Sequence, residues 1–205
     1  MITLVPISHV AKQSTKNVRE AIETLKPKFV AVELCNERVS KRKPKKEKLS
    51  RRSLLAKVLV YFQEKYAKKV GTKAGNEMRT AMKEGRKVGA TVILIDRPVS
   101  VTLDRLSKSI SIWDLFRIVF DGLTGSEVPF DLNTVPSSAV VDELVEQLKD
   151  GFPKIYKVLI TERDAYMAEQ LKGKDSVVAV VGAGHVKGLL KRKDLGITVW
   201  KGEKK

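Results

Sequence analysis

Cysteine and long apolar runs are both scarce in this chain of 205 residues. Cys35 is the only cysteine, so no internal disulfide can form, and a reducing compartment is favoured. No apolar run approaches the ~18 residues that a membrane span needs, and the amino terminus lacks the charged and then apolar pattern of a secretory signal peptide. We therefore expect a cytoplasmic protein that does not cross a bilayer by itself, folded as one domain over residues 1–205.

Acidic side chains are fewer than basic ones. The chain has 24 Asp and Glu residues and 40 Lys and Arg residues, which gives a formal net charge of +16. Such an excess raises the question of a polyanionic partner, either nucleic acid, an anionic membrane surface or an acidic peptide. The densest basic stretch, residues 40–53, contains no aromatic side chains between its charges and no nucleic-acid-binding motif. We interpret it as a solvated basic loop and do not expect nucleic acid as a partner.

Histidine occurs only twice, and each copy follows an apolar run and a three-residue turn. His9 follows residues 2–5, and His185 follows residues 177–181 through Gly182 and Gly184. A helix is expected after His185, and its amino end favours the neutral imidazole, which is the form that binds a metal. A structural, hydrogen-bonded histidine is the main alternative. A dinucleotide-binding loop is disfavoured because Lys187 occupies the place of the third glycine.

Apolar runs separated by helical patterns predict the fold class. Four runs predict strands, and residues 197–200 predict a last one. Strands that alternate with helices indicate an α/β protein with a mostly parallel central sheet flanked by helices, in which the carboxyl ends of the strands share one edge. The four expected strands are residues 2–5, 29–32, 91–95 and 177–181. The expected helices are residues 15–26 (capped by Ser14), 54–70, 75–89, 101–108, 137–149, 154–171 and 186–192.

Charged residues follow two of these predicted strands. Glu33 comes directly after residues 29–32, and Asp96 and Arg97 come after residues 91–95. A carboxylate at the end of a buried strand is costly unless it is paired or bound to a metal. We therefore predict a metal site formed by His9, His185 and Glu33, with Zn²⁺, Mn²⁺ or Co²⁺ as the cofactor. An ion-pair network without a metal remains the structural alternative.

Further charged residues are candidates for catalysis beside Glu33, which could bind the metal or activate water. Arg97, Arg105 or Arg163 could pair with buried carboxylates or stabilise an oxyanion. The set of predicted catalytic residues is Glu33, Arg163, Asp164, Arg97 and Glu77, the last lying in the opening turn of the helix expected after Gly75.

Two stretches between residues 110 and 137 carry less specific predictions. Residues 121–136 are rich in Gly, Pro and Asn and form the best candidate for a lid over the site. The apolar positions from Trp113 to Leu123 recur at helical spacing and are interpreted as core. A substrate groove or a dimer face, and hence a homo-oligomer, is the alternative.

Five segments, taken in order, resemble the TraB/PrgY (pheromone shutdown) family, and together they cover nearly the whole chain. The family is similar to the Tiki metal-dependent proteases and, more distantly, to erythromycin esterase-like and ChaN-like proteins. The resemblance implies that architecture, and a divalent-metal hydrolase (a metallopeptidase) that cleaves or inactivates peptides through paired Gly-x-x-His motifs and a glutamate. The segments are residues 8–10 with Ser14, residues 32–38, residues 94–97 with 102–105, residues 162–167 and residues 180–188.

The first of the two histidine motifs departs from the family pattern. Pro6 stands where the family has glycine, and proline fixes φ and removes a backbone donor beside His9. The alternative function is therefore a non-catalytic protein that binds or sequesters peptides, or a membrane-associated regulatory domain. Some members of the family continue into membrane helices, so this chain could be part of a longer protein whose basic surface faces an anionic leaflet.

Overall fold

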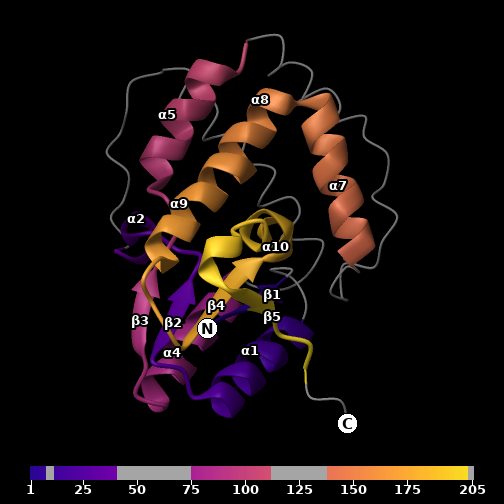
Figure 1. Ribbon diagram of the computed structural model, residues 1–205. Helices are drawn as coiled ribbons and strands as arrows, with labels where there is room; N and C mark the ends of the chain where they lie inside the picture. Colours follow the sequence, from indigo (N-terminus) through magenta and orange to yellow (C-terminus); the bar gives the residue numbers. More distant parts are fainter. Residues whose placement is uncertain (8–11, 41–74, 112–137, 203–205) are drawn as a thin grey trace.

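A single parallel sheet organises the part of the chain that the structure covers. The computed structural model describes residues 1–7, 12–40, 75–111 and 138–202. In these ranges five strands pair in the order β3-β2-β4-β1-β5, and each pair is parallel. The predicted α/β fold is confirmed (Figure 1). The strands are β1 (Ile2–Ile7), β2 (Phe29–Val32), β3 (Thr91–Leu94), β4 (Val177–Gly182) and β5 (Ile197–Val199).

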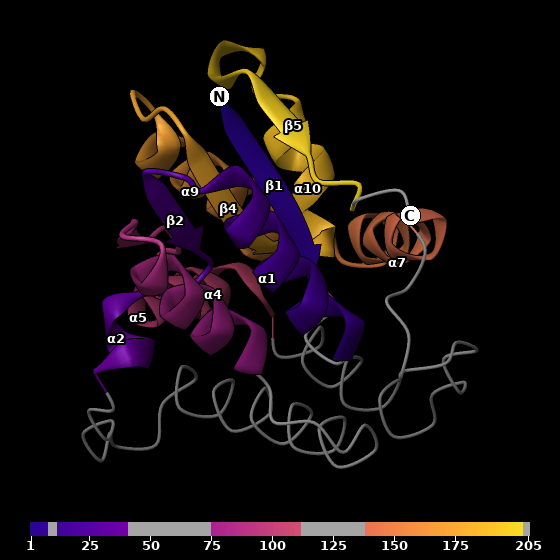
Figure 2. The same ribbon diagram turned by 90° about the horizontal axis from the view of Figure 1, so that it is seen from below.

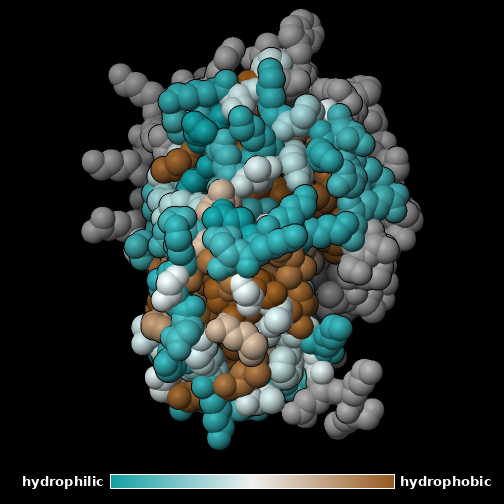
Figure 3. All heavy atoms as spheres, in the orientation of Figure 1, coloured by the Kyte–Doolittle hydropathy of each residue, from teal (hydrophilic) through white to brown (hydrophobic). Residues whose placement is uncertain are grey.

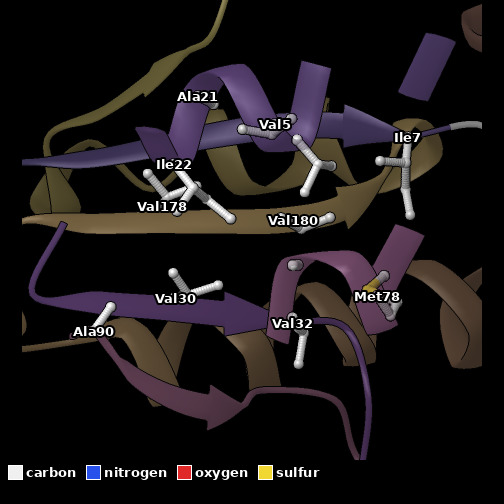
Figure 4. Close-up of a cluster of buried hydrophobic side chains, with 12 residues drawn as sticks. Val5, Ile7, Ala21, Ile22, Val30, Val32, Met78, Ala90, Val178 and Val180 are labelled. Atoms are coloured by element: carbon white, nitrogen blue, oxygen red, sulfur yellow. The ribbon is translucent and has the colours of Figure 1, made fainter. Parts of the chain in front are cut away.

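Helices cover both faces of the sheet. On one face lie α1 (Lys12–Leu25) and α4 (Asn76–Lys87), and on the other lie α9 (Glu162–Leu171) and α10 (Ala183–Leu190), as Figure 2 shows. The α1 and α4 side chains form one core with the sheet, drawn in Figure 4. Its buried members are Val5, Ile7, Val18, Ala21, Ile22, Val30, Val32, Met78, Ala81, Ala90, Val178 and Val180.

The central strand β4 shows why this sheet is apolar on both faces. All six of its residues are buried, as expected for a parallel strand with helices above and below. Its alternate side chains enter different cores, with Val180 on the α1 and α4 face and Val181 on the α9 and α10 face. The same alternation in β2 puts Val32 on the α1 and α4 face, so Glu33, the next residue, points toward α9 and α10.

A third apolar cluster lies beyond the carboxyl edge of the sheet. It joins α5 (Val99–Ser109), α8 (Pro153–Tyr156) and the π-helix η1 (Lys157–Thr161), with α7 (Ser138–Gly151) packed against it. In Figure 1, α8, η1 and α9 form one continuous segment that runs from this cluster down to the sheet. The carboxyl ends of β2, β3 and β4 therefore lie beneath these helices. The buried members of the cluster are Leu106, Ile110, Ile155 and Val158.

The surface over these helices is largely polar. In the face drawn in Figure 3, hydrophilic residues cover the helices beyond the carboxyl edge, and hydrophobic residues are visible lower down, at the level of α10 and the sheet. In the described ranges, no helix is both long and apolar enough to span a membrane.

Two predicted helix starts are wrong. The helix α1 begins at Lys12, so Ser14 is a buried residue inside it and not its cap. The helix α10 begins at Ala183, directly after β4. Gly182 remains extended, with φ −59° and ψ 140°, and Gly184 is helical, so no glycine turn separates strand from helix. His185 consequently lies in the first turn of α10.

The segment predicted as one helix over residues 154–171 contains the π-helix η1, which was not predicted. Two short helices, α2 (Asn36–Val39) and the 3-10 helix η2 (Lys193–Leu195), were also not predicted. His9, the helix over 54–70, nearly all of the basic loop 40–53, the apolar positions from Trp113 to Leu123 and the lid candidate 121–136 lie outside the described residues.

Pro6 lies inside β1, and the sheet accommodates it. Pro6 is opposite Val181 in the pairing of β1 with β4, whereas the pairing of β1 with β5 ends at Leu4. The Leu4 carbonyl accepts a hydrogen bond from Trp200 N on the β5 side, and by alternation the Pro6 nitrogen points to that same side. The missing N–H therefore falls beyond the end of β5, where no ladder bond is lost.

Gly85 of α4 provides a test of how closely this helix packs on β2. A Cβ at this position would lie 2.8 Å from Val30 Cγ2 and 3.0 Å from Val30 Cβ. We expect Gly85→Ala to lower the free energy of unfolding by about 1–3 kcal/mol, measured by denaturant titration, because overpacking outweighs the better helix propensity of alanine. Gly151→Ala in α7, where no atom of the described residues lies within 4 Å of the added Cβ, should be neutral or slightly stabilising. Equal stability of the two variants would contradict the packing.

Candidate functional site

Glu33 is the meeting point of the candidate site. Its carboxylate is buried (7% exposed) just past the end of β2. Glu33 Oε2 accepts a hydrogen bond from the Gly182 backbone N–H at 2.6 Å. Glu33 Oε1 is bound by Arg163 Nη2 and lies 3.3 Å from His185 Nε2. The ends of β2 and β4 and the helices α9 and α10 are thus joined through one side chain.

Arg163 links two strand ends from its position on α9. Its Nε and Nη2 atoms lie 2.9 and 3.0 Å from the two carboxylate oxygens of Asp96, and Nη2 also binds Glu33. Its Nη1 donates to the Leu159 carbonyl of η1 at 3.3 Å. A planar guanidinium suits such a forked arrangement. Arg163 therefore holds the carboxylates that follow β2 and β3 in one network.

His185 lies between two carboxylates. Its Nδ1 atom is 2.6 Å from Asp164 Oδ1, and its Nε2 atom faces Glu33. Burial alone would lower the pKa of His185, but its hydrogen bonds to Asp164 and Glu33 raise that pKa to about 9. The imidazole is therefore protonated at neutral pH in the metal-free protein. The predicted neutral ring is wrong for this state, because two carboxylates outweigh the amino end of α10.

The neighbouring charges also move the pKa values of the other members. Burial alone would raise the pKa of Glu33, but His185, Arg163 and the Gly182 N–H hold it well below its usual range. Burial raises the pKa of Asp164, and His185 offsets only part of that rise. Desolvation would lower the pKa of Arg163, and Glu33 and Asp96 raise it further above its usual value instead. Glu33 and Arg163 are therefore charged at every physiological pH.

Arg97, a predicted catalytic residue, belongs to an adjoining network. Its Nη1 lies 2.7 Å from Glu162 Oε2, its Nη2 donates to the Val158 carbonyl at 3.0 Å, and its Nε donates to Thr102 Oγ1 at 3.2 Å. Arg105 shares the same Glu162 carboxylate at 2.8 Å. The Arg97 guanidinium therefore connects α5 to η1 and α9. In the described part of the chain it is bound to Glu162 and not to Glu33.

Glu77 lies apart from this cluster. It is buried (3% exposed) in the first turn of α4, which packs on the opposite face of the sheet from α9 and α10. Within the described ranges, its Oε2 atom has no hydrogen-bond partner, and no ion pair joins Glu77 to Glu33 or His185. Its proposed catalytic role stays a prediction.

Two of the three predicted metal ligands, Glu33 and His185, are brought together. The third, His9, lies outside the described residues. Among the described side chains, no group of three or more His, Cys, Asp and Glu is arranged to hold a metal ion. The donor chemistry nevertheless fits a divalent metal, because His185 presents Nε2 beside a carboxylate oxygen while Nδ1 is held by Asp164, which is the usual setting of a ligating histidine.

Three consecutive charges at the start of α9, directly after the π-helix η1, serve three different partners. Successive residues of a helix point about 100° apart, so Glu162 reaches Arg97, Arg163 reaches Glu33, and Asp164 reaches His185. The carbonyls of Val158 and Leu159 in η1 accept from the two arginines. Sequence reasoning missed η1 and the role of Glu162. The one available signal was three adjacent charges in an otherwise amphipathic helix.

Comparison with known proteins gives a consistent result along the chain. The family model for the TraB/PrgY/gumN family matches residues 2–195. An uncharacterized protein of Methanocaldococcus jannaschii is 32% identical over 208 residues, which cover 93% of this chain and 52% of that protein. A TraB domain-containing protein of Homo sapiens is 26% identical over 233 residues, covering 93% of this chain and 62% of its own length. The chain thus spans between half and two thirds of these relatives.

The role of Arg163 can be tested against Arg105, an arginine of the adjoining network. Arg163→Ala leaves the buried carboxylates of Glu33 and Asp96 without their shared cation, and we expect it to lower the free energy of unfolding by about 3–5 kcal/mol. Arg105 is largely exposed, and Arg97 still pairs with Glu162 without it, so Arg105→Ala should change stability little. Chemical denaturation of the metal-free proteins measures both. A comparable loss in the two variants would show that the Glu33 network is not the stabilising one.

His185 should give the metal-free protein a pH-dependent stability. Its pKa in the folded protein, about 9, lies above the ordinary histidine value of 6.5, so its stabilisation is complete below pH 6.5 and is lost as the pH rises toward 9. We expect a loss of up to about 3 kcal/mol across this window, measured by denaturation in the presence of chelator. His185→Gln retains His9 and should have a flatter profile there. Identical slopes in the two proteins would contradict the assignment.

Proposed function

This chain belongs to the TraB/PrgY/gumN family, and from that premise we propose that it is a divalent-metal-dependent hydrolase that cleaves peptides. The peptidase class depends on the expected relation of this family to the Tiki proteases, and both are part of the proposal. Because the chain covers 52–62% of the relatives described above, the activity proposed is that of the domain over residues 1–205. Peptides, and not nucleic acids, are the proposed substrates.

The observation that carries the proposal is the arrangement of His185 between Asp164 and Glu33. Asp164 Oδ1 lies 2.6 Å from Nδ1, and this contact fixes the ring so that Nε2 faces Glu33 Oε1 at 3.3 Å. Histidines that bind metals commonly donate their other ring N–H to a carboxylate, which sets the tautomer and the orientation of the ring. Asp164 is accordingly proposed as a positioning residue, and His185 and Glu33 as ligands.

Each charged residue near His185 has a proposed part in the reaction. His185 and Glu33, with His9 as the third predicted ligand, would hold Zn²⁺, Mn²⁺ or Co²⁺. Such an ion lowers the pKa of a bound water and polarises a carbonyl group. Arg163 holds the Glu33 carboxylate in place, and its positive charge favours negative charge that develops nearby. Since this guanidinium is buried and bound to two carboxylates, it acts without rearranging.

The metal is tested directly. The protein is purified without chelator or histidine tag, and bound metal is measured by mass spectrometry. We expect a stoichiometric divalent metal in the parent protein, and its loss from His185→Ala and Glu33→Gln, because these changes remove the two donors. Arg105→Ala is the matched control, since it alters the adjoining network and no proposed ligand. Circular dichroism of each variant verifies that loss of metal does not follow from loss of the fold.

Two results would overturn the proposal. The first is a parent protein that binds no Mn²⁺, Co²⁺ or Zn²⁺ when each ion is supplied. The second is full metal content in both His185→Ala and Glu33→Gln, because the ion would then lie elsewhere.

A second candidate is a non-catalytic domain that binds or sequesters peptides. It is favoured by the completeness of the network, since both nitrogens of His185 and both oxygens of Glu33 already contact protein groups. Long incubation of a peptide library with the metal-loaded protein separates the candidates. Cleavage products in the mass spectrum that are absent with His185→Ala support hydrolysis, whereas retained intact peptides support sequestration.

A further inference from the structure

The helix α10 approaches Asp164 closely at Gly188. A Cβ built at Gly188 would lie 1.7 Å from Asp164 Oδ2, 2.6 Å from Cγ and 3.3 Å from Cβ. Real Cβ atoms essentially never come within 3.0 Å of heavy atoms from other parts of the chain, so no residue with a side chain fits at position 188 while Asp164 keeps its place. Gly188 follows His185 by three positions and thus lies on the same side of α10.

We infer that Gly188 is a positioning residue: the space left by its missing side chain holds the Asp164 carboxylate against His185 and thereby aims the ring at Glu33. Only the expected effect of Gly188 on metal binding rests on the proposed function. The contact between Asp164 and His185 is a property of the metal-free protein and can be measured there.

The backbones on both sides of this contact are fixed, so a new side chain would displace the carboxylate. On α10, Leu189 is fully buried in the core that also contains Met167 and Leu171 of α9. At the start of α10, the Gly182 N–H is bound to Glu33. Separating the helices would open this core, which costs more than rotating one short side chain. We therefore expect Gly188→Ala to fold, with the Asp164 carboxylate turned away from His185.

A displaced carboxylate leaves His185 Nδ1 without its acceptor. The imidazole then loses the contact that sets its rotation, and Nε2 is no longer directed at Glu33. Removing the carboxylate that supports a ligating histidine typically weakens metal binding 10–100-fold. We expect a loss of about that size for Gly188→Ala if the proposed metal site is correct.

The chain contains a matched control in the same helix. Among the described residues, a Cβ at Gly184 would meet only Val145 Cγ2 at 3.5 Å, which is an ordinary van der Waals contact. Gly184→Ala and Gly188→Ala therefore make the same chemical change in α10. Only Gly188→Ala places an atom against Asp164.

The first readout is the imidazole N–H resonance of the metal-free protein, recorded by NMR with ¹⁵N-labelled histidine. A hydrogen bond of 2.6 Å between His185 Nδ1 and Asp164 should give a far-downfield signal, which is assigned by its absence from His185→Gln. We expect this signal in the parent protein and in Gly184→Ala, and its loss in Gly188→Ala. Calorimetric titration of the stripped proteins with Zn²⁺ is the second readout, with Gly184→Ala expected close to the parent.

The double variant Asp164→Ala/Gly188→Ala tests whether the effect of Gly188→Ala arises from contact with the Asp164 carboxylate. Asp164→Ala removes Oδ1, Oδ2 and Cγ and leaves only the contact at 3.3 Å, so adding Gly188→Ala to it should change little. If Gly188→Ala fails to fold, recovery of folding in the double variant supports the inference, and failure of both overturns it. Retention of the downfield signal in Gly188→Ala also overturns it.

The two proposals fail in different ways. If the parent protein binds no metal, the metal-dependent function is refuted. The positioning role still holds in that case if the downfield signal is present in the parent protein and in Gly184→Ala and is lost in Gly188→Ala. If the parent protein binds metal and Gly188→Ala leaves the downfield signal unchanged, the positioning role of Gly188 is refuted and the metal-dependent function still holds.

Discussion

A carboxylate buried at the carboxyl edge of the sheet is the constraint on which the rest of this structure depends. Glu33 is charged and buried, so it requires partners that are also buried, and it has a backbone N–H, a guanidinium and an imidazolium. Arg163 and His185 need acceptors in turn, which Asp96 and Asp164 provide. Because removing one partner of a buried pair leaves a stranded charge, the residues that stabilise the fold are the same ones that are proposed to act in the site.

Topology supplies these partners at one place. A parallel sheet puts all carboxyl ends on one edge, which joins Glu33 after β2, Asp96 after β3 and Gly182 at the end of β4. The remaining partners come from the start of α9, which directly follows the π-helix η1, and from α10, which carries His185. The adjoining pair of Arg97 and Glu162 ties that start to α5. Three strand ends and two helices thus define the site before any ligand is considered.

The strands and most of the charged positions could be predicted, because a buried parallel strand leaves a plain apolar run and a charge at its end is conspicuous. This applied to Glu33 and to Asp96, and Arg163 was already expected to pair with carboxylates. The start of α10, the π-helix and the fit of Gly188 could not be predicted. They depend on contacts between segments far apart in the chain, such as the 149 positions that separate Gly182 from Glu33. The protonation of His185 depends on two such contacts at once.

The charges of the completed network bear on what it can bind. Four carboxylates, those of Glu33, Asp96, Glu162 and Asp164, are matched by three guanidiniums and the His185 imidazolium, so the metal-free network is neutral overall. A divalent ion bound at His185 would replace the proton there and leave one positive charge in excess. In a buried setting such an excess favours an anion or a developing oxyanion more than it would in water. The charge neutrality that stabilises the metal-free network would therefore give its metal-bound form a net positive charge that attracts an anionic group.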